Sequence, residues 1–218
     1  LTPDGTNRVY ATYIGGSGIE QPHSLVVDGQ GNLILAGRTN SENYPASKVG
    51  SGGSYDIVVT KLNATGTNNI GSLRIGGSLD DGVNICSTRN RNSLQYNYGD
   101  EGRTEVILDG GGNIYVASST QSSNFPVTGG FQGNNAGKQD GVVIKLSPNV
   151  TNVLFSTYLG GDQNDAAYVL AISPITRDIY VAGGTESSNL SRTTGRVFNS
   201  NQGKIDGFVS IISNDGSV

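Results

Sequence analysis

The stretch YLGGDQNDAAYVLAI, residues 158–172, decides the fold, because it joins two strand-like apolar runs through a glycine pair and a short acidic loop. The same order of features occurs in YIGGSGIEQPHSLVV at 13–27 and begins again in RIGGSLDD at 74–81. Recurrence of this kind is typical of a repeat protein, in which each copy is one structural unit. We call the loops of the three copies the junction loops: residues 15–20, 76–81 and 160–165.

Each copy continues with a sequence that predicts a β-hairpin. The segments SLVVDGQGNLILAGRT (24–39), EVILDGGGNIYVASST (105–120) and VLAISPITRDIYVAGGT (169–185) each place a turn between two apolar runs. Asp, Gly and Asn in the first two turns favour a tight reversal, whereas SPITRD in the third predicts a longer one. The flanking Val, Ile, Leu and Tyr residues are types that fit a pleated surface.

A second predicted hairpin completes the copies. It covers residues 55–77 and 139–161, and residues 205–218 contain its first strand. Residues 1–16 resemble its closing half, with a strand at 8–14, so we expect twelve strands in the order one, four, four and three. The chain is then a single β-domain with these parts: 1–16 as the closing strand of a preceding unit, 17–77, 78–161 with an insertion at 84–103, and the incomplete 162–218.

Polar segments connect the two hairpins of each copy, and we expect them to be loops. NSENYPASKVGSGGS (40–54) and QSSNFPVTGGFQGNNAGK (121–138) each place an aromatic residue between an asparagine and a proline, Tyr44 or Phe125. An aromatic side chain in such a loop is typical of a plug under neighbouring structure, and stacking on a ligand is the alternative.

Four linked motifs resemble the SBBP β-propeller repeat of bacterial proteins. They are FSTYLGG (155–161), DGGGNIYV (109–116), SNFP (123–126) and DGVVIKLSP (140–148). The likeness covers almost the whole chain except the insertion 84–103, and several linked motifs are more specific than any single glycine pattern.

The resemblance implies an all-β fold, a β-propeller-like array of four-stranded antiparallel blades. Twelve strands make three blades, whereas propellers have about four to eight, so we expect part of a larger propeller with further blades of the same chain as neighbours. If the ends meet instead, the strand at 206–212 would pair with the strand at 8–14. The resemblance also implies a noncatalytic scaffold of an exported bacterial protein, secreted or at the cell surface, with adhesion or protein and glycan contacts through its loops.

Glycine pairs and several aspartates recur once per copy, so we expect structural roles for them. The glycines allow the chain to leave one unit sharply and enter the next. Aspartates in the hairpin turns would cap their own backbone, and those before the third strand of a copy would accept backbone N–H bonds. These structural residues are Gly15, Gly16, Gly76, Gly77, Gly160, Gly161, Asp28, Asp109, Asp56, Asp140 and Asp206.

Composition excludes several classes of function. A net charge of −4 argues against a nucleic-acid partner, and no apolar run approaches the roughly 20 residues that a membrane-spanning helix needs. One histidine, His23, excludes a zinc site built from several histidines. One cysteine, Cys86, excludes an internal disulfide framework.

The junction loops hold the candidate metal ligands. Carboxylate oxygens are the ligands that calcium prefers, although these loops lack the alternating Asp-x-Asp-x-Asp-Gly pattern of a dedicated calcium loop. We therefore expect no obligatory cofactor and keep calcium as the alternative to solvated loop carboxylates. A polysaccharide-acting propeller enzyme is the rival function, because paired carboxylates would serve glycoside cleavage. The candidate metal ligands are Asp80, Asp81, Asp162 and Asp165.

The insertion 84–103 has no counterpart in the other copies. Arginine and tyrosine dominate protein interfaces, and long loops on rigid scaffolds often carry binding. A tolerated surface excursion is the alternative. The candidate binding residues are Arg89, Arg91, Tyr96, Tyr98 and Arg103.

Overall fold

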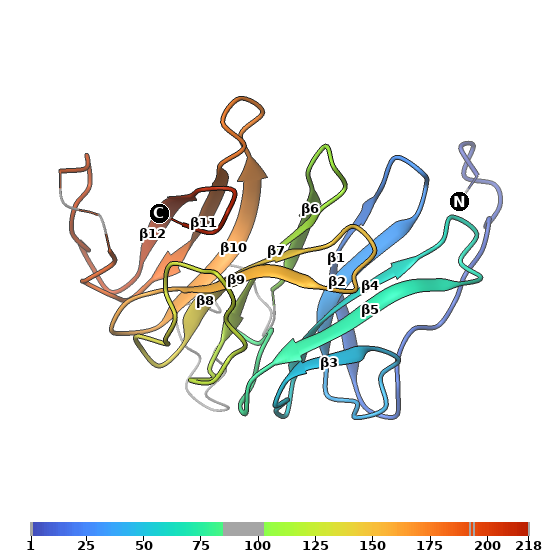
Figure 1. Ribbon diagram of the computed structural model, residues 1–218, viewed down its shortest axis with the longest axis horizontal. Coiled ribbons are helices and arrows are strands. Elements are labelled where there is room, and N and C mark those ends of the chain that lie inside the picture. The colour runs from blue at the N-terminus through green and yellow to red at the C-terminus, as the bar shows by residue number, and fades with distance from the viewer. Residues whose placement is uncertain (1, 85–102, 192, 194, 218) are drawn as a thin grey trace.

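The computed structural model describes residues 2–84, 103–191, 193 and 195–217, and these residues form three β-sheets side by side (Figure 1). The described part of the chain holds twelve strands and no helix, so the all-β fold class is confirmed. Consequently, none of these residues belongs to a helix with the length and hydropathy needed to cross a bilayer.

The first sheet has five strands in the spatial order β1-β2-β4-β5-β3. Its neighbours are antiparallel except β3 and β5, which are parallel. The strands are β1 (Glu20–Val27), β2 (Leu33–Thr39), β3 (Ser47–Gly50), β4 (Asp56–Leu62) and β5 (Asn69–Gly76).

The second and third sheets are antiparallel and follow chain order. The second contains β6 (Glu105–Leu108), β7 (Ile114–Thr120), β8 (Asp140–Leu146) and β9 (Val153–Leu159). The third contains β10 (Asp165–Ile172), β11 (Ile179–Thr185) and β12 (Asp206–Ile212), and β12 has no strand on its outer side among the described residues.

Two predictions about strands were wrong. Residues 8–14 are not a strand, because no neighbouring strand offers them a ladder of backbone hydrogen bonds. The polar segment 40–54 was expected to be a loop throughout, but β3 lies within it and adds to the outer edge of β5. The described residues therefore hold twelve strands, as expected, but the set of strands differs: β3 is present and residues 8–14 are not a strand. The first sheet has five strands instead of four.

The hydrophobic core lies between the sheets. Ile114 and Val116 of β7 belong to a cluster shared with Ile34 of the first sheet. Tyr115 and Ala117, the alternate residues of the same strand, belong to a cluster shared with the third sheet. Alternation along a strand sends successive side chains to opposite faces, so the middle sheet is buried on both faces.

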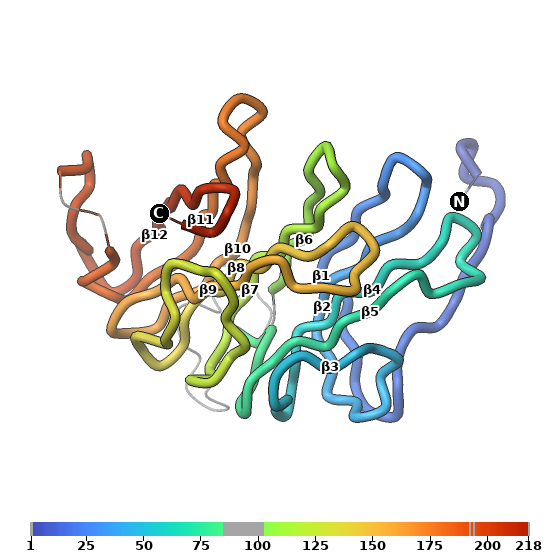
Figure 2. The backbone as a smooth tube through the Cα atoms, in the orientation of Figure 1, coloured from blue at the N-terminus to red at the C-terminus, as the bar shows by residue number. Residues whose placement is uncertain are grey.

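The backbone trace in Figure 2 shows the consequence for shape: the N-terminal segment runs beside the first sheet, and the C-terminus lies on the third. The two chain ends therefore flank opposite sides of the array.

The short turn between β1 and β2 is built around Asp28. Its Oδ1 accepts hydrogen bonds from the Gln30 and Asn32 amides, both at 2.9 Å, and Gly31 has a φ of 79°, in the left-handed region that favours glycine. Asp109 accepts the same pair of bonds from Gly111 and Asn113 in the β6–β7 turn. Lys61 of β4 also lies 2.7 Å from the Asp28 carboxylate.

Candidate functional site

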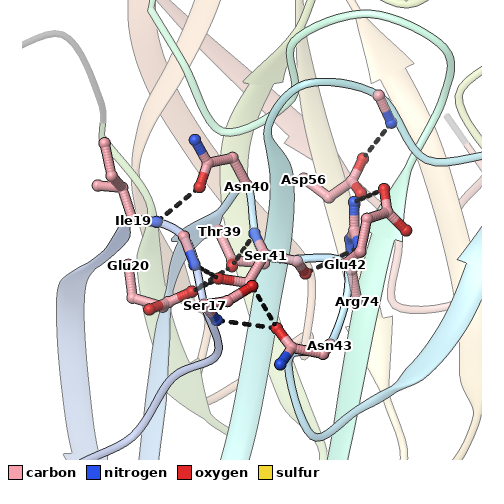
Figure 3. Close-up of polar contacts among 12 residues, drawn as sticks. Ser17, Ile19, Glu20, Thr39, Asn40, Ser41, Glu42, Asn43, Asp56 and Arg74 are labelled. Carbon is pink, nitrogen blue, oxygen red and sulfur yellow. Dashed lines mark hydrogen bonds and ion pairs between the residues drawn. The ribbon is translucent and has the colours of Figure 1, made fainter.

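The candidate site is the row of junction loops, each of which leads into the first strand of a sheet; the second and third loops connect consecutive sheets. Figure 3 shows the first of them. Glu20, the first residue of β1, accepts hydrogen bonds from Thr39 Oγ1 at 2.8 Å and from Ser41 Oγ. The carboxylate thus fastens the start of β1 to the end of β2.

Aspartates fill the same position in the other two junction loops. Asp81 accepts bonds from Thr120 Oγ1, from Ser122 Oγ at 3.1 Å and from the Gly77 amide at 2.7 Å. Asp165 accepts bonds from Ser187 Oγ and from the Gly161 amide, both at 2.7 Å. Both aspartates are buried, so these carboxylates are engaged by the protein itself.

An asparagine holds each junction loop from the other side. The side-chain oxygens of Asn43, Asn124 and Asn189 accept bonds from the amides of Ser17, Ser78 and Asp162, each at 2.8 Å. A serine two residues earlier in each copy accepts a second loop amide, as Ser41 does from Gly18 at 2.7 Å.

Sequence reasoning missed this set of residues, although a signal was present. The pattern Thr-x-Ser-x-Asn follows the second strand in every copy, at residues 39–43, 120–124 and 185–189. The sequence analysis assigned a role only to the aromatic residue that follows this pattern in the first two copies. The threonine also accepts the serine amide, as Thr120 does from Ser122 at 3.0 Å, so the pattern forms one hydrogen-bonded unit.

The glycine pairs have a reason that differs from the expected one. A Cβ on Gly77 would lie 2.3 Å from the Ser122 Cβ, and a Cβ on Gly161 would lie 2.7 Å from the Ser187 Cβ. Neither position has left-handed φ. Close approach of the serine–asparagine unit, and not a sharp chain departure, therefore requires glycine at the second position of each pair.

Each copy has a further carboxylate at the start of its third strand, and those of the first two copies enter the junction loops 76–81 and 160–165. Asp56 accepts bonds from the Gly53 amide at 3.0 Å and from Arg74 Nε. Asp140 accepts bonds from the Ala136 amide and Gln132 Nε2, both at 2.9 Å, and Asp206 accepts one from the Gln202 amide.

These carboxylates face those of the junction loops. Oxygens of Asp56 and Asp81 both crowd the position of a Cβ on Gly76, at 1.9 and 2.7 Å. Burial, opposed by hydrogen bonds from Thr120 and Gly77, raises the pKa of Asp81 to about 7, and the nearby Asp56 charge adds to the rise. Burial likewise raises the pKa of Asp140 to about 6, with a contribution from Asp165.

The outer strands of the first two sheets differ at one position near these carboxylates. In β5, Arg74 donates Nη1 to the Ser41 carbonyl at 2.9 Å and pairs with Asp56. In β9, Tyr158 occupies the same position and donates its hydroxyl to the Ser122 carbonyl at 2.7 Å. Both side chains therefore bind the serine carbonyl, but only the arginine carries a positive charge.

A comparison with known families matches one part of the chain. Residues 9–45 match the family model of the SBBP beta-propeller repeat. The matched SBBP repeat contains Gly16, Glu20, Thr39, Ser41 and Asn43, which build the first junction, so the resemblance expected from the sequence is confirmed there. No curated protein matches the chain.

The aromatic residues Tyr44 and Phe125 of the polar segments are plugs, as expected. Tyr44 and Phe125 are both buried. The Tyr44 hydroxyl lies 2.9 Å from Thr60 Oγ1, and the Phe125 ring meets Tyr158 edge to face. These positions leave no exposed ring for stacking on a ligand.

The four candidate calcium ligands are not brought together as one set. Asp81 and Asp165 lie in different junctions and accept protein hydrogen bonds, while Asp162 is exposed. In residues 2–84, 103–191, 193 and 195–217, no three His, Cys, Asp or Glu side chains are grouped so that they would hold a metal ion.

Most of the candidate binding residues of the insertion lie outside the described residues. These are Arg89, Arg91, Tyr96 and Tyr98. Arg103 is described, and its Nε donates to the Tyr168 carbonyl of β10 at 3.4 Å. Arg103 therefore contacts the third sheet.

Proposed function

We propose that this chain is a noncatalytic propeller-like scaffold, with its three sheets as consecutive blades, of an exported bacterial protein that acts at the cell surface or after secretion. Its loops contact protein or glycan partners in adhesion. The match to the SBBP beta-propeller repeat and the shared core between neighbouring sheets support the arrangement.

The use of the junction carboxylates is the observation that carries the proposal. Asp81 and Asp165 are buried and hold neighbouring hairpins, as Glu20 does at the first junction. A carboxylate recurs in this role at every junction and stabilises the array, and two of the three carboxylates, Asp81 and Asp165, are buried. This structural role of the carboxylates supports a noncatalytic function better than an enzymatic one.

Side chains on the outside of the junction loops supply a contact surface. Ile19 and Leu79 are each more than half exposed. Apolar side chains at the tips of rigidly held loops are favourable contacts for a partner, because little conformational entropy is lost when they bind. Calcium at Asp80, Asp81, Asp162 and Asp165 stays a prediction, tested by whether a chelator lowers the melting temperature.

The rival function is a polysaccharide-acting enzyme, and its requirement is two accessible carboxylates in one cavity. A groove of about 1050 Å³ beside β12 has Asp206 as the one carboxylate among its described lining residues. This arrangement favours the scaffold over the enzyme.

One experiment separates the two functions. The purified chain is incubated with soluble cell-surface polysaccharides, released reducing ends are measured, and retention on immobilised glycans and surface proteins is measured in parallel. We expect no release, and we expect retention that Leu79→Ser weakens while Leu154→Ser, a matched change at an exposed leucine of β9, does not. Release of reducing ends that Asp80→Asn or Asp162→Asn abolishes would overturn the proposal.

A further inference from the structure

The outer face of the third sheet exposes apolar side chains that its counterparts bury. Val209 of β12 is 73% exposed, whereas Val59 of β4 and Val143 of β8, at the same position in their strands, are 0% exposed. Tyr180 of β11 is 40% exposed, whereas Tyr115 of β7 is 0% exposed. This face therefore has the apolar residues of an interface between two sheets, but no further sheet of the described chain covers it.

The opposite face of the first sheet has the complementary character. Leu25 of β1 is 64% exposed, whereas Val106 of β6 and Leu170 of β10, at the same position, are 3% and 8% exposed. Inside the molecule, these positions pack against the preceding sheet. The two ends of the array are thus the two halves of an interface that the molecule already contains twice.

The edge of β12 leaves room for a strand. In the first sheet β3 pairs with the outer strand β5, and in the second sheet Thr128 exchanges hydrogen bonds with Ser156 of the outer strand β9. Among the described residues, the polar segment of the third copy, residues 186–204, has no such strand to pair with. Instead, residues between Leu190 and Gln202 and β12 line the groove of about 1050 Å³.

Residues 8–14 have the sequence of that outer strand. They precede Gly15 and Gly16 as β5 and β9 precede the later glycine pairs. They pair with no strand, and Tyr13 is fully exposed, while Ile14 lines a small cavity against Leu35 and Val58 of the first sheet. The segment therefore already lies where the outer strand of a preceding sheet would lie.

We propose that two copies of this chain associate head to tail, with residues 8–14 of each copy added to β12 of the other as its fourth strand. The pairing of Val59 with Leu73 and of Val143 with Thr157 sets the register, so Val209 lies opposite Thr12 of the second copy. Leu25 and its neighbours then cover Tyr180 and Val209. The inference rests on the propeller arrangement of the proposed function.

For the 218-residue chain taken by itself, the number of sheets favours a closed ring of two copies. Heterologous contacts between identical chains close into rings or extend as filaments. One copy holds three sheets, below the range of about four to eight blades found in propellers, and three copies would hold nine, above it. Two copies, with six sheets, fall within the range.

The first test measures the mass of the purified 218-residue chain in solution by sedimentation, across a range of concentrations. We expect a dimer. Val209→Lys and Leu25→Lys each place a charge in the new interface and should raise the dissociation constant by about 100-fold. Both positions are exposed in the single copy, so the fold tolerates the changes, which circular dichroism and the melting temperature verify. Ile175→Lys, at an exposed turn residue between β10 and β11, is the matched control and should leave the dimer intact.

The second test examines the register. Thr12→Cys and Val209→Cys are made in separate chains that both carry Cys86→Ser, since Cys86 is the one native cysteine. Residues opposite each other in an antiparallel pair lie within disulfide range. We expect the mixed chains, on oxidation, to give a cross-linked dimer, and each chain alone, or Thr12→Cys mixed with Ile175→Cys, to give none.

Three outcomes would overturn the inference. These are a monomer at every concentration, a dimer that neither lysine variant weakens, or polymers that grow without limit. None of them bears on polysaccharide release or on partner retention, so a failure here is distinguishable from a failure of the proposed function.

Discussion

At the scale of single residues, the junctions are set by close contacts between small side chains and buried carboxylates. The second glycine of each pair leaves space for the serine and asparagine side chains that pack against it. One carboxylate per junction accepts hydrogen bonds from the hydroxyl groups of the same pattern. A small number of residues therefore fixes the spacing between sheets.

Adding one methyl group at Gly77 tests this closeness. Gly77→Ala would place its Cβ 2.3 Å from the Ser122 Cβ, so we expect the free energy of unfolding to fall by about 2–4 kcal/mol. Gly133→Ala is the control, because nothing lies within 4 Å of its added Cβ, and it should change stability by less than about 1 kcal/mol. Urea unfolding measures both, and equal effects would contradict the steric explanation.

The raised pKa of Asp81 gives a dependence of stability on pH. The pKa is about 7 in the folded protein against 3.8 ordinarily, so between these values the folded protein keeps a proton that the unfolded chain releases. The contribution of Asp81 to stability is then greatest below about pH 4 and falls as pH rises to 7, by up to about 1.4 kcal/mol per pH unit.

Asp81→Asn should flatten this fall, since the amide resembles the neutral carboxyl and does not titrate. We expect the variant to match the parent near pH 4 and to exceed it in stability at pH 8, measured by urea unfolding. Asp28→Asn is the opposite control: burial would raise the pKa of Asp28, but Lys61 and the turn donors hold it below the ordinary value. That variant should lose stability at pH 8, and an unchanged slope in Asp81→Asn would refute the assignment.

At the scale of elements, β12 differs from the corresponding strands β4 and β8. Each of those strands pairs on both sides and is buried almost throughout. By contrast, β12 pairs with β11 alone and, before the buried Ile212, alternates between half-buried and exposed residues. A strand with one open edge is expected to be the weakest of the three.

Hydrogen exchange measures this difference. In the Val209→Lys variant, which we expect to be monomeric, the amides of β12 should exchange faster than those of β8, because half of the β12 ladder faces solvent. In the parent chain the added strand should slow exchange in β12 and leave β8 unchanged. The same β12 rate in both proteins would argue against strand addition.

Sequence patterns predicted most of the elements. The hairpins at 24–39, 105–120 and 169–185 are all present, because turn residues and β-branched runs act locally. The strand at 8–14 was wrong, because a strand also needs a neighbour that no local pattern supplies. β3 was missed for the converse reason, since its polar sequence becomes a strand only beside β5.

At the scale of the whole molecule, three sheets share two cores, and the same interface faces appear uncovered at both ends. The proposed head-to-tail dimer rests on this repetition of interface faces. Of the candidate metal ligands, Asp81 and Asp165 hold the junction loops by hydrogen bonds.

The sequence by itself determined the all-β fold, the repeat, the hairpins and the likeness to the SBBP repeat, because glycine pairs, turn aspartates and apolar alternation are short-range signals. Only the tertiary structure decided the roles of Glu20, Asp81 and Asp165, since hydroxyls and amides from distant segments surround them. It also decided that β12 stays open and residues 8–14 unpaired. Strand pairing and burial depend on which surfaces meet, and no local pattern specifies that.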